Sequence, residues 1–115
     1  MADLPFSPFL NSKDLIFFSG KIELTSEGKL QEGTIAEKTK QVMKNVKTEL
    51  KKAGLKVSDI VFSQVFLTDM KDYQEFNDEY IKHLEKPYPA RFVVAVKELP
   101  LGASVEISVI ASKNN

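Results

Sequence analysis

The chain has 115 residues, and its sixteen acidic and sixteen basic side chains balance to zero net charge at neutral pH. This length fits one domain over residues 1–115, and the neutral charge argues against a general nucleic-acid binder, which normally carries a basic excess. The absence of cysteine excludes disulfides and cysteine metal sites. With no secretory signal and no apolar run near the ~20 residues that span a bilayer, we expect a cytoplasmic protein without a membrane partner.

Two strands are predicted near the start of the chain. Residues 15–18 form a short apolar run that is closed by Ser19 and Gly20. Residues 21–24 then alternate between polar and apolar side chains, and residues 25–29 have the composition of a turn.

A long amphipathic helix follows. Thr34 and Glu37 have the spacing of a capping box, and Gly54 is a natural stop. Apolar or small residues recur on one face at helical spacing: Ile35, Thr39, Val42, Met43, Val46, Leu50 and Ala53. The lysines lie mostly off that stripe, a pattern typical of a solvated helix face rather than of RNA binding on a neutral protein.

The second half of the chain predicts a strand, a helix and two more strands. Residues 57–67 are apolar on both faces, and Asp69 with Asp72 opens a second helix. The core-facing aromatic residues of this helix are Tyr73, Phe76 and Tyr80. Strands at 91–96 and 104–111 complete the order β-β-α-β-α-β-β, an α+β fold with one sheet and two helices.

The strands contain adjacent apolar pairs, which place apolar side chains on both faces of the sheet. The pairs are Phe17 with Phe18, Val61 with Phe62, and Val93 with Val94. Two helices can cover one face only, and a monomer rarely exposes a large apolar patch. We therefore expect self-association through the other face.

Arg91 is the only arginine in a chain that has fifteen lysines. It enters an apolar strand directly after Pro89 and Ala90. A guanidinium binds a carboxylate or phosphate through two parallel hydrogen bonds, which an ammonium group cannot do. The alternative is a strand-end arginine with a buried stem and a solvated head.

Glu106 is the one carboxylate inside the apolar strand at 104–111. It alternates with Val105 and Ile107, so it belongs to the more polar side of the strand. Such a residue either faces solvent or acts as an acid or base whose pKa depends on burial. The lone His83 has too few partners for a zinc site, and we expect it at the surface.

Several segments resemble the RidA/YjgF family of reactive-intermediate deaminases. The most specific are Pro89-Ala90-Arg91 and Val105-Glu106-Ile107. The remaining similar segments are Ser19-Gly20, residues 41–46 before 53–55, 59–61 before 65–67, and 76–80. The resemblance covers about residues 5–111.

The resemblance implies a chorismate-mutase-like homotrimer, with one mixed sheet, two helices on one face, and a cleft between each pair of subunits. It implies hydrolysis of 2-imino acids, of the 2-iminobutanoate and 2-iminopropanoate type, to 2-keto acids and ammonia, without a metal or organic cofactor. Arg91 matches the arginine that holds the substrate carboxylate, and Glu106 matches the glutamate that places the attacking water. The resemblance implies substrate-binding positions at Ser19, Gly20, Val93, Phe6 and Asn77.

Three positions depart from the family pattern. Lys21 stands where glutamine is usual, Phe6 where a tyrosine is typical, and Val93 where many bacterial members have cysteine. These changes leave the preference among imino acids open. Two other functions stay open as well: a non-catalytic module that binds small carboxylates, which Phe6 favours, and a ribonuclease or translation inhibitor, against which the neutral charge and single histidine count. Chorismate mutase activity would need more cationic groups than one arginine.

Overall fold

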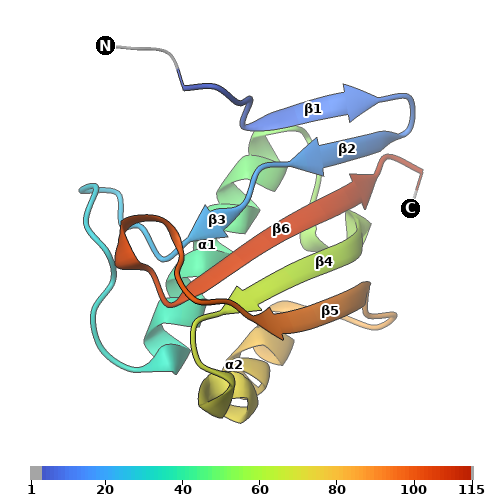
Figure 1. Cartoon of the computed structure of the whole chain (residues 1–115). Helices are drawn as coiled ribbons and strands as arrows, with labels where there is room; N and C mark the ends of the chain where they lie inside the picture. Colours follow the sequence, from blue (N-terminus) through green and yellow to red (C-terminus); the bar gives the residue numbers. More distant parts are fainter. Residues whose placement is uncertain (1–3, 115) are drawn as a thin grey trace.

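The computed structural model describes residues 4–114 as one mixed sheet with two α-helices packed against one of its faces (Figure 1). The strands are β1 (Phe9–Ser12), β2 (Leu15–Phe18), β3 (Lys21–Ile22), β4 (Ile60–Leu67), β5 (Ala90–Ala95) and β6 (Val105–Ser112). The α-helices are α1 (Ile35–Lys52) and α2 (Tyr73–Tyr80). The α+β class predicted from the sequence is confirmed.

Strand β6 lies at the centre of the sheet. The strand order is β1-β2-β6-β4-β5, and the short β3 also pairs with β6. Strands β4 and β5 run parallel, whereas the other pairings are antiparallel. Strand β6 therefore joins the N-terminal strands β2 and β3 to β4.

The predicted capping box of α1 is confirmed. The Thr34 hydroxyl accepts from the Glu37 N–H at 3.1 Å, and the Glu37 carboxylate accepts from the Thr34 N–H at 3.0 Å. Except for the partly exposed Ala53, which caps the C-terminal end, the apolar stripe predicted for this helix is buried. Gly54 follows Ala53 with a φ of +77°, a conformation in which glycine has no steric penalty.

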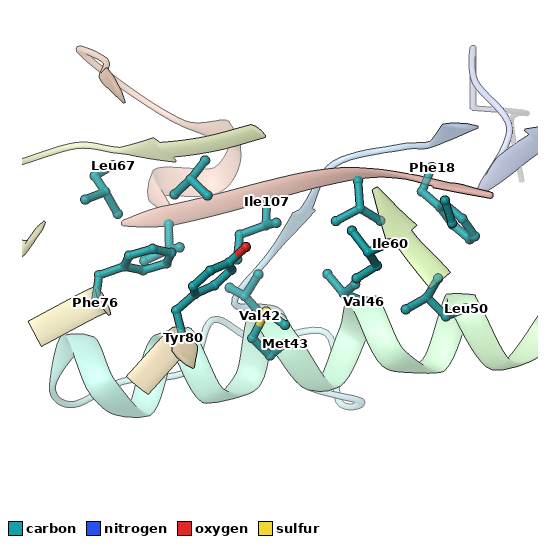
Figure 2. Packing of buried hydrophobic residues seen from close by; sticks show 14 of the residues in the cluster. Phe18, Val42, Met43, Val46, Leu50, Ile60, Leu67, Phe76, Tyr80 and Ile107 are labelled. Atoms are coloured by element: carbon teal, nitrogen blue, oxygen red, sulfur yellow. The ribbon is translucent and has the colours of Figure 1, made fainter. Parts of the chain in front are cut away.

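The core fills the space between the helices and one face of the sheet. Figure 2 shows Val42, Met43 and Val46 of α1 facing Ile107 of β6, with Phe76 and Tyr80 of α2 beside them. Every second residue of β6 points into this core: Val105, Ile107, Val109 and Ala111. The intervening residues of β6 point to the opposite face.

That opposite face has no cover within the described chain. On it Phe92 of β5 packs edge-on against Phe62 and Phe66 of β4, each at 5.8 Å between ring centroids. Phe17 and Val94 remain 44 % and 41 % exposed. The prediction of two apolar faces, of which the helices cover one, is confirmed.

Three details of the fold differ from the prediction. Strand β1 was not predicted, because its sequence, Phe-Leu-Asn-Ser, has no clear alternation. Strand β3 is shorter than residues 21–24, because the Glu23 side chain turns into the core and binds backbone N–H groups. Residues 57–59 form a 3-10 turn before β4 rather than part of the strand.

The second helix also starts later than Asp69. The Asp69 side chain caps a 3-10 turn (Met70–Asp72) that runs directly into α2. Of its aromatic residues, Phe76 and Tyr80 are buried as predicted, but Tyr73 is 39 % exposed. None of the helices in the described part of the chain is long and apolar enough to cross a membrane.

We predict that Thr34→Ala lowers the free energy of unfolding by about 1 kcal/mol, because the first turn of α1 loses its side-chain acceptor. Chemical denaturation monitored by circular dichroism measures this change. Thr48→Ala is the matched control. The Thr48 hydroxyl only bonds back to the Lys44 carbonyl within the helix, so its removal is expected to leave stability equal or slightly higher.

Candidate active site

Arg91 lies on β5, at the edge of the sheet that α2 covers. It pairs in register with Ser63 of β4, whose buried hydroxyl accepts from the Tyr80 hydroxyl at 2.9 Å. The Arg91 guanidinium lies over the Tyr80 ring, with 5.1 Å between Cζ and the ring centroid. Arg91 is therefore anchored on the helix side of the sheet.

Two side chains of α2 hold the guanidinium by hydrogen bonds. Arg91 Nη1 donates to Asn77 Oδ1 at 2.7 Å, and Arg91 Nη2 donates to the Tyr73 hydroxyl at 3.3 Å. A guanidinium carries five N–H donors, so most of them stay available for an anion. The group borders a cavity of about 390 Å³ whose wall also includes Tyr88 and Pro89.

Glu106 lies on β6, on the face opposite to the helices. It pairs with Phe66 of β4 and Ile22 of β3. Burial raises the pKa of its carboxyl above the ordinary value for glutamate. Among residues 4–114 no cation or hydrogen-bond donor is paired with this carboxylate. Its protonation is therefore set by desolvation.

Glu106 packs directly against Gly20. A Cβ atom on Gly20 would overlap Glu106 Oε2 and lie 2.9 Å from Glu106 Cδ. The backbone of Gly20 is not in the left-handed region, so an added Cβ would be opposed by the Glu106 side chain rather than by backbone conformation. The motif Ser19-Gly20 thus leaves room for the glutamate.

Ser19 fixes the N-terminal segment beside this glutamate. Its hydroxyl donates to the Ser7 carbonyl, and its N–H donates to the Pro8 carbonyl at 3.0 Å. A cavity of about 690 Å³ is bordered by Phe6, Ser19, Gly20 and Glu106. Phe6 is 59 % exposed at its rim.

The predicted site residues therefore form two groups that do not meet within one chain. Arg91 and Asn77 border one cavity on the helix side, whereas Glu106, Gly20 and their neighbours border another. Arg91 and Glu106, the two candidate catalytic residues, are thus separated within one chain. The structure places them on opposite faces of the sheet, because each side chain follows the alternation of its own strand.

The side chains of Val93 and Lys21 both point to the helix side of the sheet. Val93 lies two residues after Arg91 on the same face, with its side chain packed against the core. Lys21 pairs with Ile107, so it points to the helix side of β3, where its ammonium lies 3.5 Å from Glu49 Oε1. Lys21 therefore borders the cavity of Glu106 without sharing its face.

Two residues near the site were not found from the sequence. Tyr73 was assigned to the core, but its hydroxyl binds Arg91. Glu23 was read as part of an alternating strand, but its buried carboxylate accepts from the N–H groups of Ser104 and Val105 at 2.8 and 3.2 Å. Neither contact leaves a signal in the spacing of residues.

His83 differs from the prediction of a surface residue. Its side chain is only 13 % exposed and lies between two charged groups. Nε2 is 2.7 Å from Glu79 Oε2, and Nδ1 is 2.8 Å from Lys47 Nζ. His83 borders neither the cavity of Arg91 nor the cavity of Glu106.

We predict that Gly20→Ala displaces the Glu106 side chain and costs about 1 kcal/mol of stability, the low end of the usual range for overpacking, because the end of that side chain can move. Chemical denaturation of a double-mutant cycle with Glu106→Ala tests this contact. In the Glu106→Ala background the methyl group has space, so Gly20→Ala should then cost much less. Equal costs in both backgrounds would contradict the packing.

We also predict that Glu106→Gln stabilises the folded protein at neutral pH. A carboxyl whose folded pKa is raised favours folding below its unfolded pKa, and this advantage is lost as pH rises through the folded pKa. The variant should match the wild type near pH 4 and unfold at a higher temperature at pH 7–8. Thermal unfolding over this range measures the difference, and Glu27→Gln on an exposed turn is the control.

Known proteins are similar to this chain over nearly its whole length. The model of the family described as Endoribonuclease L-PSP matches residues 1–113. Protein MMF1, mitochondrial, of Saccharomyces cerevisiae is 39 % identical over 110 residues, which are 96 % of this chain and 76 % of that protein. Reactive Intermediate Deaminase A, chloroplastic, of Arabidopsis thaliana is 36 % identical over 109 residues, which are 94 % of this chain and 58 % of that protein.

The fold matches solved structures equally well. The crystal structure of YEO7_yeast superposes with a TM-score of 0.93 at 38 % identity, covering 98 % of this chain and 90 % of that one. The family match, the sequence identities and the fold agree, and the family resemblance drawn from the motifs is confirmed. The chain belongs to the Endoribonuclease L-PSP family, which is the RidA/YjgF family.

Proposed function

We propose that the protein hydrolyses reactive 2-imino acids to 2-keto acids and ammonia at a site built by two copies of the chain. The observation that carries this proposal is the division of the site. A held guanidinium lies on one face of the sheet, and a desolvated carboxylate lies on the other. The name of the Arabidopsis relative, Reactive Intermediate Deaminase A, supports the same class of reaction.

Arg91 would bind the carboxylate of the imino acid. Asn77 and Tyr73 occupy one donor on each terminal nitrogen, so the remaining donors can form two parallel bonds to a carboxylate. This contact fixes the position of the neighbouring imine carbon. Because imines hydrolyse unaided in water, positioning and the direction of a water molecule are the main contributions needed.

Glu106 would orient that water and transfer its protons. Water adds its oxygen to the imine carbon, one proton passes to the nitrogen, and the resulting carbinolamine expels ammonia to leave the keto group. A carboxyl with a raised pKa exchanges protons at a pH closer to neutrality than an ordinary glutamate does. This step needs neither a metal nor an organic cofactor.

Self-association would bring the two groups together. The open face carries exposed apolar side chains on β2 and β5, and both outer strands, β1 and β5, have a free edge in the sheet of one chain. Another copy can cover these surfaces and present its Glu106 cavity to Arg91. We propose the homotrimer that the family resemblance implies, in which each cleft takes Arg91 from one subunit and Glu106 from its neighbour.

Mixing two inactive variants tests this arrangement. Arg91→Lys and Glu106→Gln are each expected to form trimers with low activity. After both are unfolded together and refolded, random assembly should place an intact Arg91 beside an intact Glu106 in about a quarter of the clefts. We therefore expect activity to return to about a quarter of the wild-type level, measured as ammonia released from a freshly generated 2-imino acid.

The controls separate the assembly from the chemistry. Each variant refolded alone should stay at its low activity, and analytical ultracentrifugation should show trimers throughout. A trimer without recovery on mixing would contradict a cleft shared between subunits. Keto-acid binding without turnover in the wild type would instead identify a non-catalytic carboxylate-binding module.

We predict that Arg91→Lys lowers kcat/KM by about ten- to a hundredfold, because one charge-assisted bond of roughly 1.5–3 kcal/mol is lost. The positive charge is kept, so the change isolates the geometry of the guanidinium. Steady-state ammonia release measures the effect, and an unchanged far-ultraviolet circular dichroism spectrum shows that the fold is intact. A kcat/KM equal to that of the wild type would contradict the assignment of Arg91 to the site.

A further inference from the structure

A basic groove runs along the outer side of α1, with its basic side chains outside both cavities of the proposed active site. It has a volume of about 340 Å³ and lies between α1 and the 3-10 turn after α2 (Ile81–His83). Its lining, here called the lysine groove, consists of Lys40, Lys44, Lys47, Thr48, Lys51 and His83. None of these side chains is acidic.

The four lysines repel one another. They occupy positions separated by four, three and four residues, so each is a direct neighbour of the next on the helix surface. Like charges at this spacing destabilise a helix by about 0.2–0.5 kcal/mol for each pair. The acids of α1 do not relieve this repulsion, because Glu37 caps the helix and Glu49 binds Lys21 and Lys52.

The groove thus concentrates positive charge on a chain that is neutral overall. Among residues 4–114 none of Lys40, Lys44 and Lys51 forms an ion pair. Solvated helix faces are normally stabilised by alternating charges. An external anion would compensate the repulsion within this row of lysines.

His83 holds the remaining lysine in place. Its Nε2 lies 2.7 Å from the Glu79 carboxylate and therefore carries the hydrogen, which leaves Nδ1 as the acceptor for the Lys47 ammonium at 2.8 Å. Glu79 also pairs with Lys82, at 3.5 Å. Lys47 is thereby fixed on the floor of the groove while the other lysines stay exposed.

The shape and chemistry of the groove indicate the class of anion. From Lys40 to Lys51 the row extends for about 16 Å along the helix, which suits a linear polyanion better than a single phosphate ion. The lining has no Phe, Tyr or Trp side chain on which a nucleobase could stack, and the His83 ring is only 13 % exposed. It also has no exposed apolar side chain to enter a lipid bilayer. Lysines act as mobile point charges, which follow a flexible chain without fixed geometry.

We propose that the lysine groove binds an unbranched inorganic polyphosphate chain through its negative charges. Such a polymer presents anionic oxygens at high density and lacks bases or side chains that would need pockets of their own. The site is separate from the proposed deaminase activity, because its four lysines and His83 line neither of those cavities, and only Thr48 borders both the groove and the cavity of Glu106.

Binding of fluorescently labelled polyphosphate, followed by anisotropy in a salt series, tests this proposal. With four lysine contacts, the slope of log K against log salt should be roughly −3, using the value for single-stranded polyanions. The variant Lys40→Gln/Lys44→Gln/Lys51→Gln should bind at least tenfold more weakly and reduce the slope to about −1. Lys47 is left unchanged so that its contact with His83 is kept.

A control variant with the same net charge separates the groove from general charge effects. Lys71→Gln/Lys97→Gln/Lys113→Gln removes three exposed lysines that lie outside the groove, and its binding should stay within about twofold of the wild type. Equal weakening in both variants would overturn the site. Tighter, groove-dependent binding of a single-stranded RNA or of a polyglutamate peptide at equal charge would overturn the choice of polyphosphate.

Discussion

The alternation of side chains along β6 determines where the parts of the proposed site lie. Because successive residues of a strand point to opposite faces, burying Val105 and Ile107 under the helices forces Glu106 out to the other face. On β5 the same alternation places Arg91 on the helix side of the sheet, because Arg91 shares its face with Val93, which packs against the core. In the deaminase that we propose, one chain would therefore present either the guanidinium or the carboxylate to a given cleft, and a complete site would need a second copy.

Much of this arrangement could be predicted from the sequence, because it depends on local patterns. The capping box at Thr34, the apolar stripe of α1 and the alternation around Glu106 each arise from residues close together in the chain. The uncovered apolar face also followed from adjacent apolar pairs. These features are set by the period of the helix or strand, which a single sequence displays.

The remaining features depend on contacts between distant residues. Tyr73 binds Arg91 across 18 positions, and Glu23 binds Ser104 across 81. No periodic pattern encodes such pairs, so Tyr73 appeared to be a core residue and Glu23 a strand residue. His83 was placed at the surface for the same reason, because its partner Lys47 lies on another helix.

The order of the strands along the chain has a consequence for folding. β2 and β3 both pair with β6, the final strand, so the closing contacts of the sheet connect residues about ninety positions apart. Contacts at such long separation form slowly, because the entropy of closing the loop is lost before the contact is gained. During synthesis, the N-terminal hairpin and α1 would remain without their central strand until β6 leaves the ribosome. The apolar stripe of α1 would be exposed throughout that interval, and transiently exposed apolar surface favours aggregation of the nascent chain.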